Sequence, residues 1–391
     1  MAQTVENSGP AEGFSLLGGP LHRLGCRLGL VRGGTNSVAL GLALGVPTWA
    51  ILVGLALLEG LGHRLFSLSV IGAHVRLLIA IPLFFVCESF LGRRLTTFVG
   101  MIASSGIVPP DELPVLEAEI ARTNRWAGSW MPDALCLVAA VLMWPIALQL
   151  HPSGVTATFD PNLSMRGATL TGLWYWGVCL TLFRFLLARW IWRLGLWSHF
   201  LWRVAKLELH LVPTHPDGAG GLGYLEVVHI EFGSLIMAVS AVEAASFAEE
   251  ISAGTMAFEA IYPALAVVLV LEAALFLGPL FIFKPKLRAC RVKGLSDYMA
   301  FAQRYVSGFD DKWLGANAVP AEPLLGTPDL QSLADLANSV NVVRKMRVIP
   351  ASGRILEQFA VAALAPALPL LLFKYPIAEL AEKVFSRLTG I

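Results

Sequence analysis

The stretch FEAIYPALAVVLVLEAALFLGPLFIF, residues 258–283, contains two acidic residues, Glu259 and Glu272, and no basic one. The hydrocarbon core of a bilayer is about 30 Å thick, and roughly 20 apolar helical residues cross it. This run is therefore long enough to span a membrane as a helix. Across all 391 residues, 56% are hydrophobic and 15% are charged, which is the composition of a membrane protein.

Six further runs have a similar length and composition. They lie at residues 37–61, 69–91, 130–150, 170–187, 231–247 and 359–377. The run at 231–247 is short and contains Glu243, so a re-entrant or tilted helix is the alternative there. The sequence thus predicts an all-α, polytopic helical membrane protein with six to seven transmembrane helices.

Basic residues in the short loops predict the orientation of these spans, because Lys and Arg resist translocation. On one side the loops carry Arg23, Arg27, Arg32, Arg93, Arg94, Arg122, Arg125, Arg189, Arg193, Arg203 and Lys206, followed by a basic segment at 284–356. The other side carries Arg64, Arg166, Lys374, Lys383 and Arg387. We therefore expect a cytoplasmic N-terminus and an outer C-terminus. No apolar run precedes residue 37, so we expect no cleaved signal peptide.

This topology divides the chain into four parts. They are a cytoplasmic N-terminal segment at 1–36, transmembrane helices 1–6 at 37–283 with cytoplasmic loops at 92–129 and 188–230, a cytoplasmic helical segment at 284–356, and a last span with a short outer tail at 357–391. Two amphipathic helices are predicted in the cytoplasmic parts, one from Pro109 to about Trp126 and one from an N-cap at Thr327 to about Arg347. Such helices suit a gate, a partner surface or an oligomer interface.

Titratable side chains within the predicted spans are functional candidates, because a charge at the bilayer centre costs a few kcal/mol. They are His74, Arg76, Glu88, Arg184, Glu243 and Glu272. One interpretation is internal pairing, in which Arg184 bonds Glu243 or Glu272 and only holds the bundle together. The other interpretation is that Glu243 and Glu272 line an aqueous ion pathway.

Three further acids, Glu249, Glu250 and Glu259, lie where the fifth and sixth spans are expected to meet the outside. In an oligomer, a ring of such acids at an outer mouth concentrates cations. The alternative is that they are ordinary loop acids that serve solubility and topology.

A basic, Trp-rich helix is predicted directly after the fourth span. Arg189, Arg193, Arg203 and Lys206 share one face of it at 100° per residue. We expect this helix to lie in the membrane interface, with the basic side chains on lipid phosphate. The alternative role is a lever that couples lipids to a pore.

The string LVPTHPDGAGGLGY, residues 211–224, contains two prolines and four glycines, which forbid a regular helix. Its candidate site residues are His215, Asp217, Gly218, Gly220, Gly221 and Gly223. Exposed amides in such a glycine loop bind anions or lipid headgroups. A transition-metal site is conceivable, but the spacing matches no compact zinc pattern. We therefore expect neither a bound metal nor a cofactor.

This loop, together with GTPDLQSLADL at 326–336 and VVRKMR at 342–347, resembles sequences of a family of multi-pass bacterial inner-membrane proteins of uncharacterised activity. The resemblance covers roughly residues 190–377. It implies a location in the bacterial cytoplasmic membrane, and it implies no activity.

The function that these observations favour is an oligomeric ion channel or transporter. Its expected partners are membrane lipids, a transported ion or small solute, and further copies of itself. A formal net charge of +1 gives no reason to expect nucleic acid. An enzyme acting on a lipid or isoprenoid phosphate at His215 and Asp217 is one alternative. It is less favoured, because signatures such as the P-loop, HExxH and GxSxG do not occur. A lipid- or protein-binding scaffold or sensor is the other.

Overall fold

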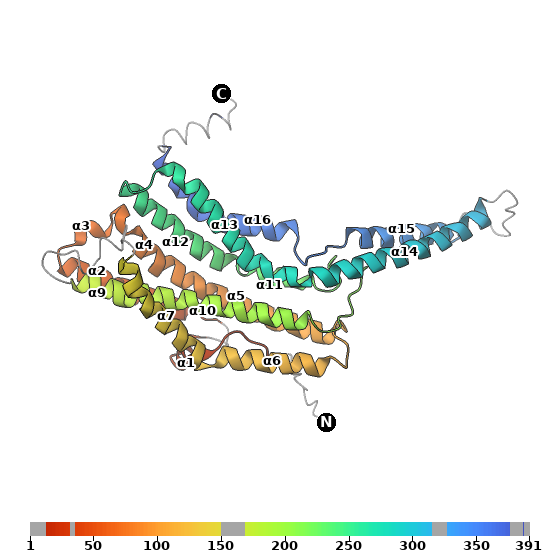
Figure 1. The fold of residues 1–391 in the computed structure, drawn as a ribbon, viewed down its shortest axis with the longest axis horizontal. Helices are drawn as coiled ribbons and strands as arrows, with labels where there is room; N and C mark the ends of the chain where they lie inside the picture. The colour runs from red at the N-terminus through yellow and green to blue at the C-terminus, as the bar shows by residue number, and fades with distance from the viewer. Residues whose placement is uncertain (1–12, 32–35, 150–168, 315–326, 376–385, 387–391) are drawn as a thin grey trace.

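The computed structural model describes residues 13–31, 36–149, 169–314, 327–375 and 386 (Figure 1). Four basic residues used for the topology prediction lie outside this part of the chain, as does nearly all of the expected outer tail. They are Arg32, Arg166, Lys383 and Arg387. The described residues form helices and no β-strand, so the predicted all-α fold is confirmed.

Six helices in the described part are long and apolar enough to cross a membrane. They are Val38–Leu58, Leu68–Ser104, Leu170–Val204, Tyr224–Ser252, Phe258–Trp313 and Gly353–Phe373. A seventh span results if Leu113–Gly128 and Trp130–Pro145, which meet at a 45° bend, count as one. The prediction of six to seven transmembrane helices is therefore confirmed.

Several of these spans are built from more than one segment. The first half of the chain comprises α1 (Gly19–Arg27), α2 (Val38–Leu58), α3 (Gly62–Leu65), η2 (Leu68–Val70), α4 (Ile71–His74), η3 (Val75–Ala80), α5 (Ile81–Ser104), α6 (Leu113–Gly128) and α7 (Trp130–Gln149). The second half comprises α9 (Leu170–Trp174), η4 (Tyr175–Leu180), α10 (Thr181–Val204), α11 (Tyr224–Ile230), α12 (Gly233–Ser252), η5 (Phe258–Ala260), α13 (Ile261–Leu277), η6 (Gly278–Phe283), α14 (Lys284–Trp313), α15 (Asp329–Lys345), α16 (Gly353–Leu364) and η7 (Ala365–Phe373). The segments η3 and η4 are π-helical turns, whereas η2, η5, η6 and η7 are 3₁₀ turns.

The fifth span is longer than the sequence predicted. Instead of residues 231–247, the helical run covers Tyr224–Ser252 with a short break before α12, so its length suffices for a full span. Hydropathy underestimates this helix because its polar side chains bond to neighbouring helices. The last span is irregular at its C-terminal end. Pro366 and Pro369 have no backbone N–H to donate there, and the α-helix tightens into the 3₁₀ segment η7.

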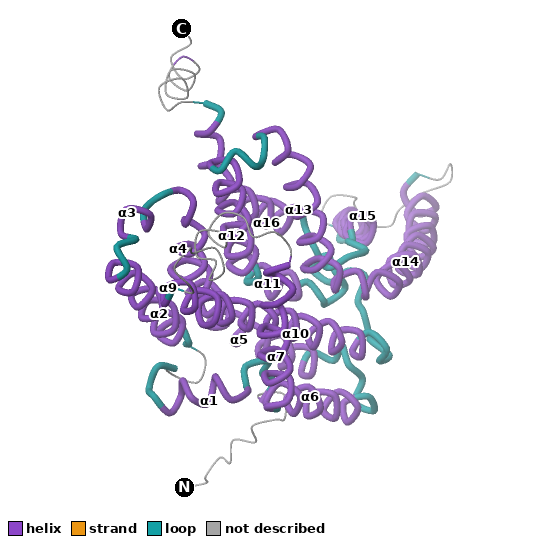
Figure 2. The backbone as a smooth tube through the Cα atoms, turned by 60° about the vertical axis from the view of Figure 1, so that its left-hand side comes forward, coloured by secondary structure: helices purple, strands orange, loops and turns teal. Residues whose placement is uncertain are grey.

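The long helices run side by side, and the hairpin of α14 and α15 extends beyond one end of the bundle (Figure 1). We call this end the hairpin end. Figure 2 shows α5 and α10 in the middle of the bundle, with α6 and α7 on one side of them. Aromatic side chains fill the core between these two helices, among them Phe84, Phe98 and Trp197. The sixth span continues past the bundle, since η5, α13, η6 and α14 form one helical run of 56 residues.

Candidate functional site

Polar side chains occur at every third position of α12. They are Ser240, Glu243, Ser246 and Glu249. Three residues turn an α-helix by about 300°, so this stripe moves around the helix by about 60° at each step. Its members consequently reach different neighbours. Ser240 contacts α13, whereas Ser246 and Glu249 contact the segment that contains α4 and η3.

The contact with α13 places a carboxylate inside the bundle. Glu272 is only 8% exposed, and its Oε1 accepts a hydrogen bond of 3.0 Å from the Ser240 hydroxyl. Its other oxygen, Oε2, is buried and has no hydrogen-bond partner among the described residues. Leaving a buried polar atom unpaired costs about 1–3 kcal/mol, and more when it is charged. Glu272 therefore lacks one partner.

Glu272 and Glu243 line the same cavity, which we call the Glu272 cavity. It has a volume of about 240 Å³ and lies between α10, α12 and α13. All its other walls are apolar side chains, namely Leu187, Trp190, Ile191, Leu194, Leu235, Val239, Val268, Leu271, Leu275 and Phe276. The structure thus brings together the two acids that the sequence singled out as an ion pathway.

A second group of polar residues surrounds Arg76. It lies on a different side of α12 from the Glu272 cavity. The Arg76 guanidinium donates to the Tyr175 hydroxyl at 3.0 Å and to the Ser246 hydroxyl at 3.3 Å. Arg76 and Tyr175 each lie in a π-helical turn, a feature that often marks functional sites in helices. Glu249 is buried nearby, and its Oε1 accepts the backbone N–H of Gly72 at 2.7 Å.

Arg184 does not form the predicted pair. Neither Glu243 nor Glu272 makes an ion pair with it in the described part of the chain. Its Nη1 is buried without a hydrogen-bond partner there. The interpretation that Arg184 neutralises one of these acids is therefore wrong.

His74 has a structural role. Its Nδ1 accepts the indole N–H of Trp49 at 2.8 Å, which leaves the proton on Nε2 to donate to the Leu65 carbonyl at 2.6 Å. The imidazole is thus a neutral bridge between α2 and the segment before α4.

Glu88 centres a different cluster, the Glu88 cluster, which also contains Arg189, Arg193, Asp133 and His22. Glu88 is 2% exposed, and its Oε2 lies 2.8 Å from Arg193 Nη1 and 3.8 Å from Arg189 Nη1. Its Oε1 lies 3.4 Å from His22 Nδ1. Arg189 also reaches Asp133 Oδ1 at 3.3 Å. The cluster therefore ties together α1, α5, α7 and α10.

This cluster corrects the predicted lipid belt. Arg189 and Arg193 are buried on Glu88 rather than exposed to lipid phosphate, because their carboxylate partner lies on another helix that one helical face cannot reveal. Arg203 pairs with Glu119 of α6 at 2.6 Å. Lys206 remains exposed, with its Nζ 3.6 Å from the centroid of the Trp202 ring.

The three acids of the expected outer mouth do not share one surface. Glu249 points into the bundle, as its bond to Gly72 shows. Glu250 is partly buried, and Glu259 is exposed and lies 3.2 Å from Lys374 Nζ. The structure thus removes Glu249 from the mouth and gives Glu259 a cationic neighbour.

The glycine loop at 211–224 is closed by its own aspartate. Asp217 Oδ1 accepts the amides of Ala219 and Gly221 at 2.8 and 3.2 Å, and Oδ2 accepts that of Gly223 at 2.7 Å. Burial alone would raise the pKa of Asp217, but these amides outweigh it and hold the pKa below its usual value. The amides expected to bind an anion therefore already hold a carboxylate.

The backbone explains why glycines stand in this loop. Gly218, Gly220 and Gly221 have φ of 64°, 66° and 101°, a region of backbone conformation that favours glycine. Gly223 differs, with φ of −61°. A Cβ there would lie 2.7 Å from Asp217 Cβ, so this glycine permits close approach.

Arg347 joins the two sequence motifs. Its backbone N–H donates to the Gly218 carbonyl at 2.8 Å, and its Nη2 donates to the Asp217 carbonyl at 2.7 Å. Its Nη1 lies 2.5 Å from Glu226 Oε2, and the Ser352 hydroxyl donates to the other oxygen of Glu226. The loop and the segment 342–347 thus form one structural unit.

His215 and Asp217 offer little to an enzyme. His215 Nδ1 lies 2.8 Å from Asp217 Oδ1, but both carboxylate oxygens are already engaged within the loop. Among the described residues, no three His, Cys, Asp or Glu side chains gather as metal ligands.

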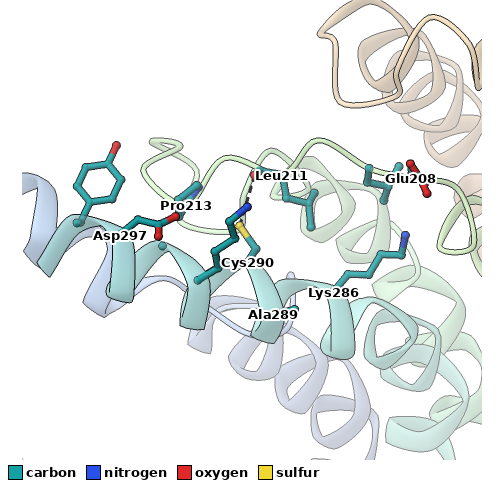
Figure 3. A pocket seen from close by; sticks show the side chains of 11 residues that line it. Glu208, Leu211, Pro213, Lys286, Ala289, Cys290 and Asp297 are labelled. Atoms are coloured by element: carbon teal, nitrogen blue, oxygen red, sulfur yellow. Dashed lines mark hydrogen bonds between the residues drawn. The ribbon is translucent and has the colours of Figure 1, made fainter. Parts of the chain in front are cut away.

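A cavity of about 590 Å³ lies beside this loop, between residues 208–213 and α14 (Figure 3). Lys286 and Glu208 stand near one end and Asp297 near the other. Lys293 also lines it, so two lysines and two acids balance in charge. The Cys290 thiol donates to the Leu211 carbonyl at 3.4 Å. The lining of this cavity therefore carries no excess of either charge.

A scan against protein-family models, a search of curated proteins and a search of solved structures each gave no match for this chain.

Sequence reasoning missed several members of these groups. Ser240 and Ser246 were not identified as partners, although the spacing of three along α12 carries that signal. His22 and Asp133 carry no local signal, because only the fold brings them to Glu88 and Arg189.

Proposed function

We propose that the protein is a membrane transporter for cations, with Glu272 and Glu243 as the binding site. The observation that carries this proposal is the buried Oε2 of Glu272, which has no partner in the described structure and belongs to a cavity shared with a second carboxylate. A buried carboxylate requires a counter-charge or a hydrogen-bond donor. A cation in the cavity supplies it.

Two other buried acids of the bundle, Glu88 and Glu249, have different surroundings. Glu88 has two arginines and a histidine around it, and Glu249 accepts a backbone amide. Glu272 has one serine and an acidic neighbour. A site that is short of partners when empty suits a ligand that binds and leaves.

Irregular turns interrupt the spans that carry this site and the Arg76 group. The 3₁₀ segment η6 directly follows the helix that carries Glu272, and the π-helical turns η3 and η4 hold Arg76 and Tyr175. Such irregular turns are where helices change their path. These turns support a transporter that changes conformation, rather than a fixed pore.

The location, orientation and oligomeric state of the chain are also part of this proposal. We propose that the chain lies in the bacterial inner membrane, that its N-terminus and hairpin end are cytoplasmic, and that it forms homo-oligomers. The basic residues near the hairpin end support the orientation. The resemblance of the motifs at 211–224 and 326–347 supports the location.

The test uses proteoliposomes on a solid-supported membrane, where concentration jumps of a transported ion produce a current. The panel contains protons, Na⁺, K⁺ and organic ammonium ions, with chloride jumps as a control. We expect a current for at least one cation, and we expect Glu272→Gln to reduce it at least tenfold.

The matched control is Glu357→Gln, the same change at an exposed acid of α16. This variant should conduct like the unmodified protein. A current that survives in Glu272→Gln, or a response to chloride jumps alone, would refute the proposal.

A further inference from the structure

We infer that the Glu272 cavity takes a lipophilic organic cation that enters sideways from the lipid. This inference rests on the proposed function, because it names the class of cation that the site binds. Three features carry it: the composition of the cavity walls, the shortage of oxygen ligands and the position of the opening.

The walls combine two acids with a continuous apolar lining. Side chains from three helices contribute, including Leu187 and Trp190 of α10, Val239 of α12 and Leu275 of α13. An organic ammonium ion matches both parts, because its charge meets the carboxylates while its hydrocarbon groups contact the apolar walls. Each apolar group buried against these walls strengthens such binding.

A small metal ion does not match this lining. Ca²⁺ takes six to eight oxygen ligands and Mg²⁺ takes six in an octahedron. Glu272, Glu243 and Ser240 are the oxygen-bearing side chains at this place in the described structure. A metal ion would have to keep most of its water against apolar walls. An organic cation carries its own apolar shell.

The opening lies on the flank of the bundle. Leu271 is 63% exposed and Ile191 is 55% exposed, and both line the cavity. Other residues of α13 near this position, Val267 and Val270, are exposed as well. In a membrane this apolar flank faces the hydrocarbon chains. A ligand that already partitions into the lipid therefore reaches Glu272 without crossing the ends of the bundle.

Binding is measured by isothermal titration calorimetry on the full chain in lipid nanodiscs, with the heats of empty nanodiscs subtracted. The probes are benzyltriethylammonium and tetramethylammonium, which carry the same charge but differ in apolar surface. We expect benzyltriethylammonium to bind at least tenfold more tightly. Glu272→Gln should weaken it at least tenfold, and Glu357→Gln should leave it unchanged.

Leu271→Trp tests the route without touching either acid. The larger side chain at the exposed rim should obstruct the opening and slow the association of benzyltriethylammonium at least fivefold, as measured by surface plasmon resonance on immobilised nanodiscs. Because Leu271 is exposed, this variant is expected to fold. It therefore tests the inference even if Glu272→Gln fails to fold.

The results separate this inference from the function on which it rests. Equal affinity for the two probes, or an unchanged association rate in Leu271→Trp, would overturn the inference. If cation currents then still require Glu272, the transporter proposal stands alone. If benzyltriethylammonium binds as expected but no cation jump produces a current, the site stands and transport is wrong.

Discussion

Glu88 and Glu272 are both carboxylates buried in long apolar helices, yet their surroundings differ. Both oxygens of Glu88 have partners, supplied by Arg193, Arg189 and His22. One oxygen of Glu272 has a serine hydroxyl and the other has no partner in the described structure. The comparison teaches that burial of an acid does not identify a site; the absence of a basic partner among the described residues does.

Removing the Glu88 carboxylate should produce the largest effect. Glu88→Gln leaves Arg189 and Arg193 buried without their shared counter-charge, and breaking such a buried pair costs about 3–5 kcal/mol. We expect a much lower midpoint of thermal unfolding in detergent and a lower yield of folded protein. A midpoint equal to that of Glu357→Gln would show that Glu88 does not hold the bundle.

The same kind of change at Glu272 should act in the opposite direction. Glu272→Leu removes an unpaired buried carboxylate, so the ligand-free protein should gain about 1–3 kcal/mol of unfolding free energy. Denaturant unfolding in mixed micelles measures this gain. A loss of stability as large as that in Glu88→Gln would erase the contrast between the two acids.

Asp217 extends the comparison to a carboxylate outside the spans. Its partners are three backbone amides, which hold its pKa below the usual value despite burial. A lowered pKa stabilises the loop above the unfolded value of about 3.9, and this stability is lost as the pH falls through the folded pKa. Hydrogen exchange of residues 218–223, corrected for intrinsic rates, should therefore accelerate below about pH 4.

Asp217→Asn should open the loop at neutral pH and abolish this pH dependence, because an amide supplies one acceptor oxygen in place of two. Its cation currents should equal those of the unmodified protein. Unchanged exchange in the variant would show that the three amides are held by other contacts.

The smallest effect is expected at Asp329. Its carboxylate accepts from Lys312 at 2.8 Å and from the Trp313 indole at 3.0 Å, and these bonds lower its pKa. Both side chains of this ion pair are partly exposed to solvent, which screens such pairs. Asp329→Asn should leave the unfolding midpoint unchanged in high salt, and a marked drop there would mean that the α14–α15 hairpin depends on this pair.

Apolar runs were enough to predict the spans, because lipid requires a long helix regardless of tertiary contacts. They underestimated the length of the fifth span, where polar side chains such as Ser246 and Glu249 bond to neighbouring helices. The two acids of the candidate site could also be identified from the sequence. Glu243 and Glu272 were identified from their cost in a membrane, and the structure brings them to one cavity.

Arg189 and Arg193 were misassigned to the lipid surface, because their partner Glu88 is remote in sequence. A helical face shows which residues are neighbours on one helix. It does not show which other helix covers that face. Glu249 was placed outside for the same reason, since its partner Gly72 belongs to the second span.

The helical run from α13 through η6 into α14 is continuous, so a small change of angle within it produces a large displacement at its end. We call the part formed by α14 the arm. From Lys284 to Trp313 the arm is about 45 Å long at 1.5 Å per residue, and Figure 1 shows it bend where it leaves the bundle. A change of about 5° at that bend moves the tip by about 4 Å. A displacement that is too small to detect beside Glu272 is therefore large enough at Trp313 to be measured as a change in the distance between two fluorophores.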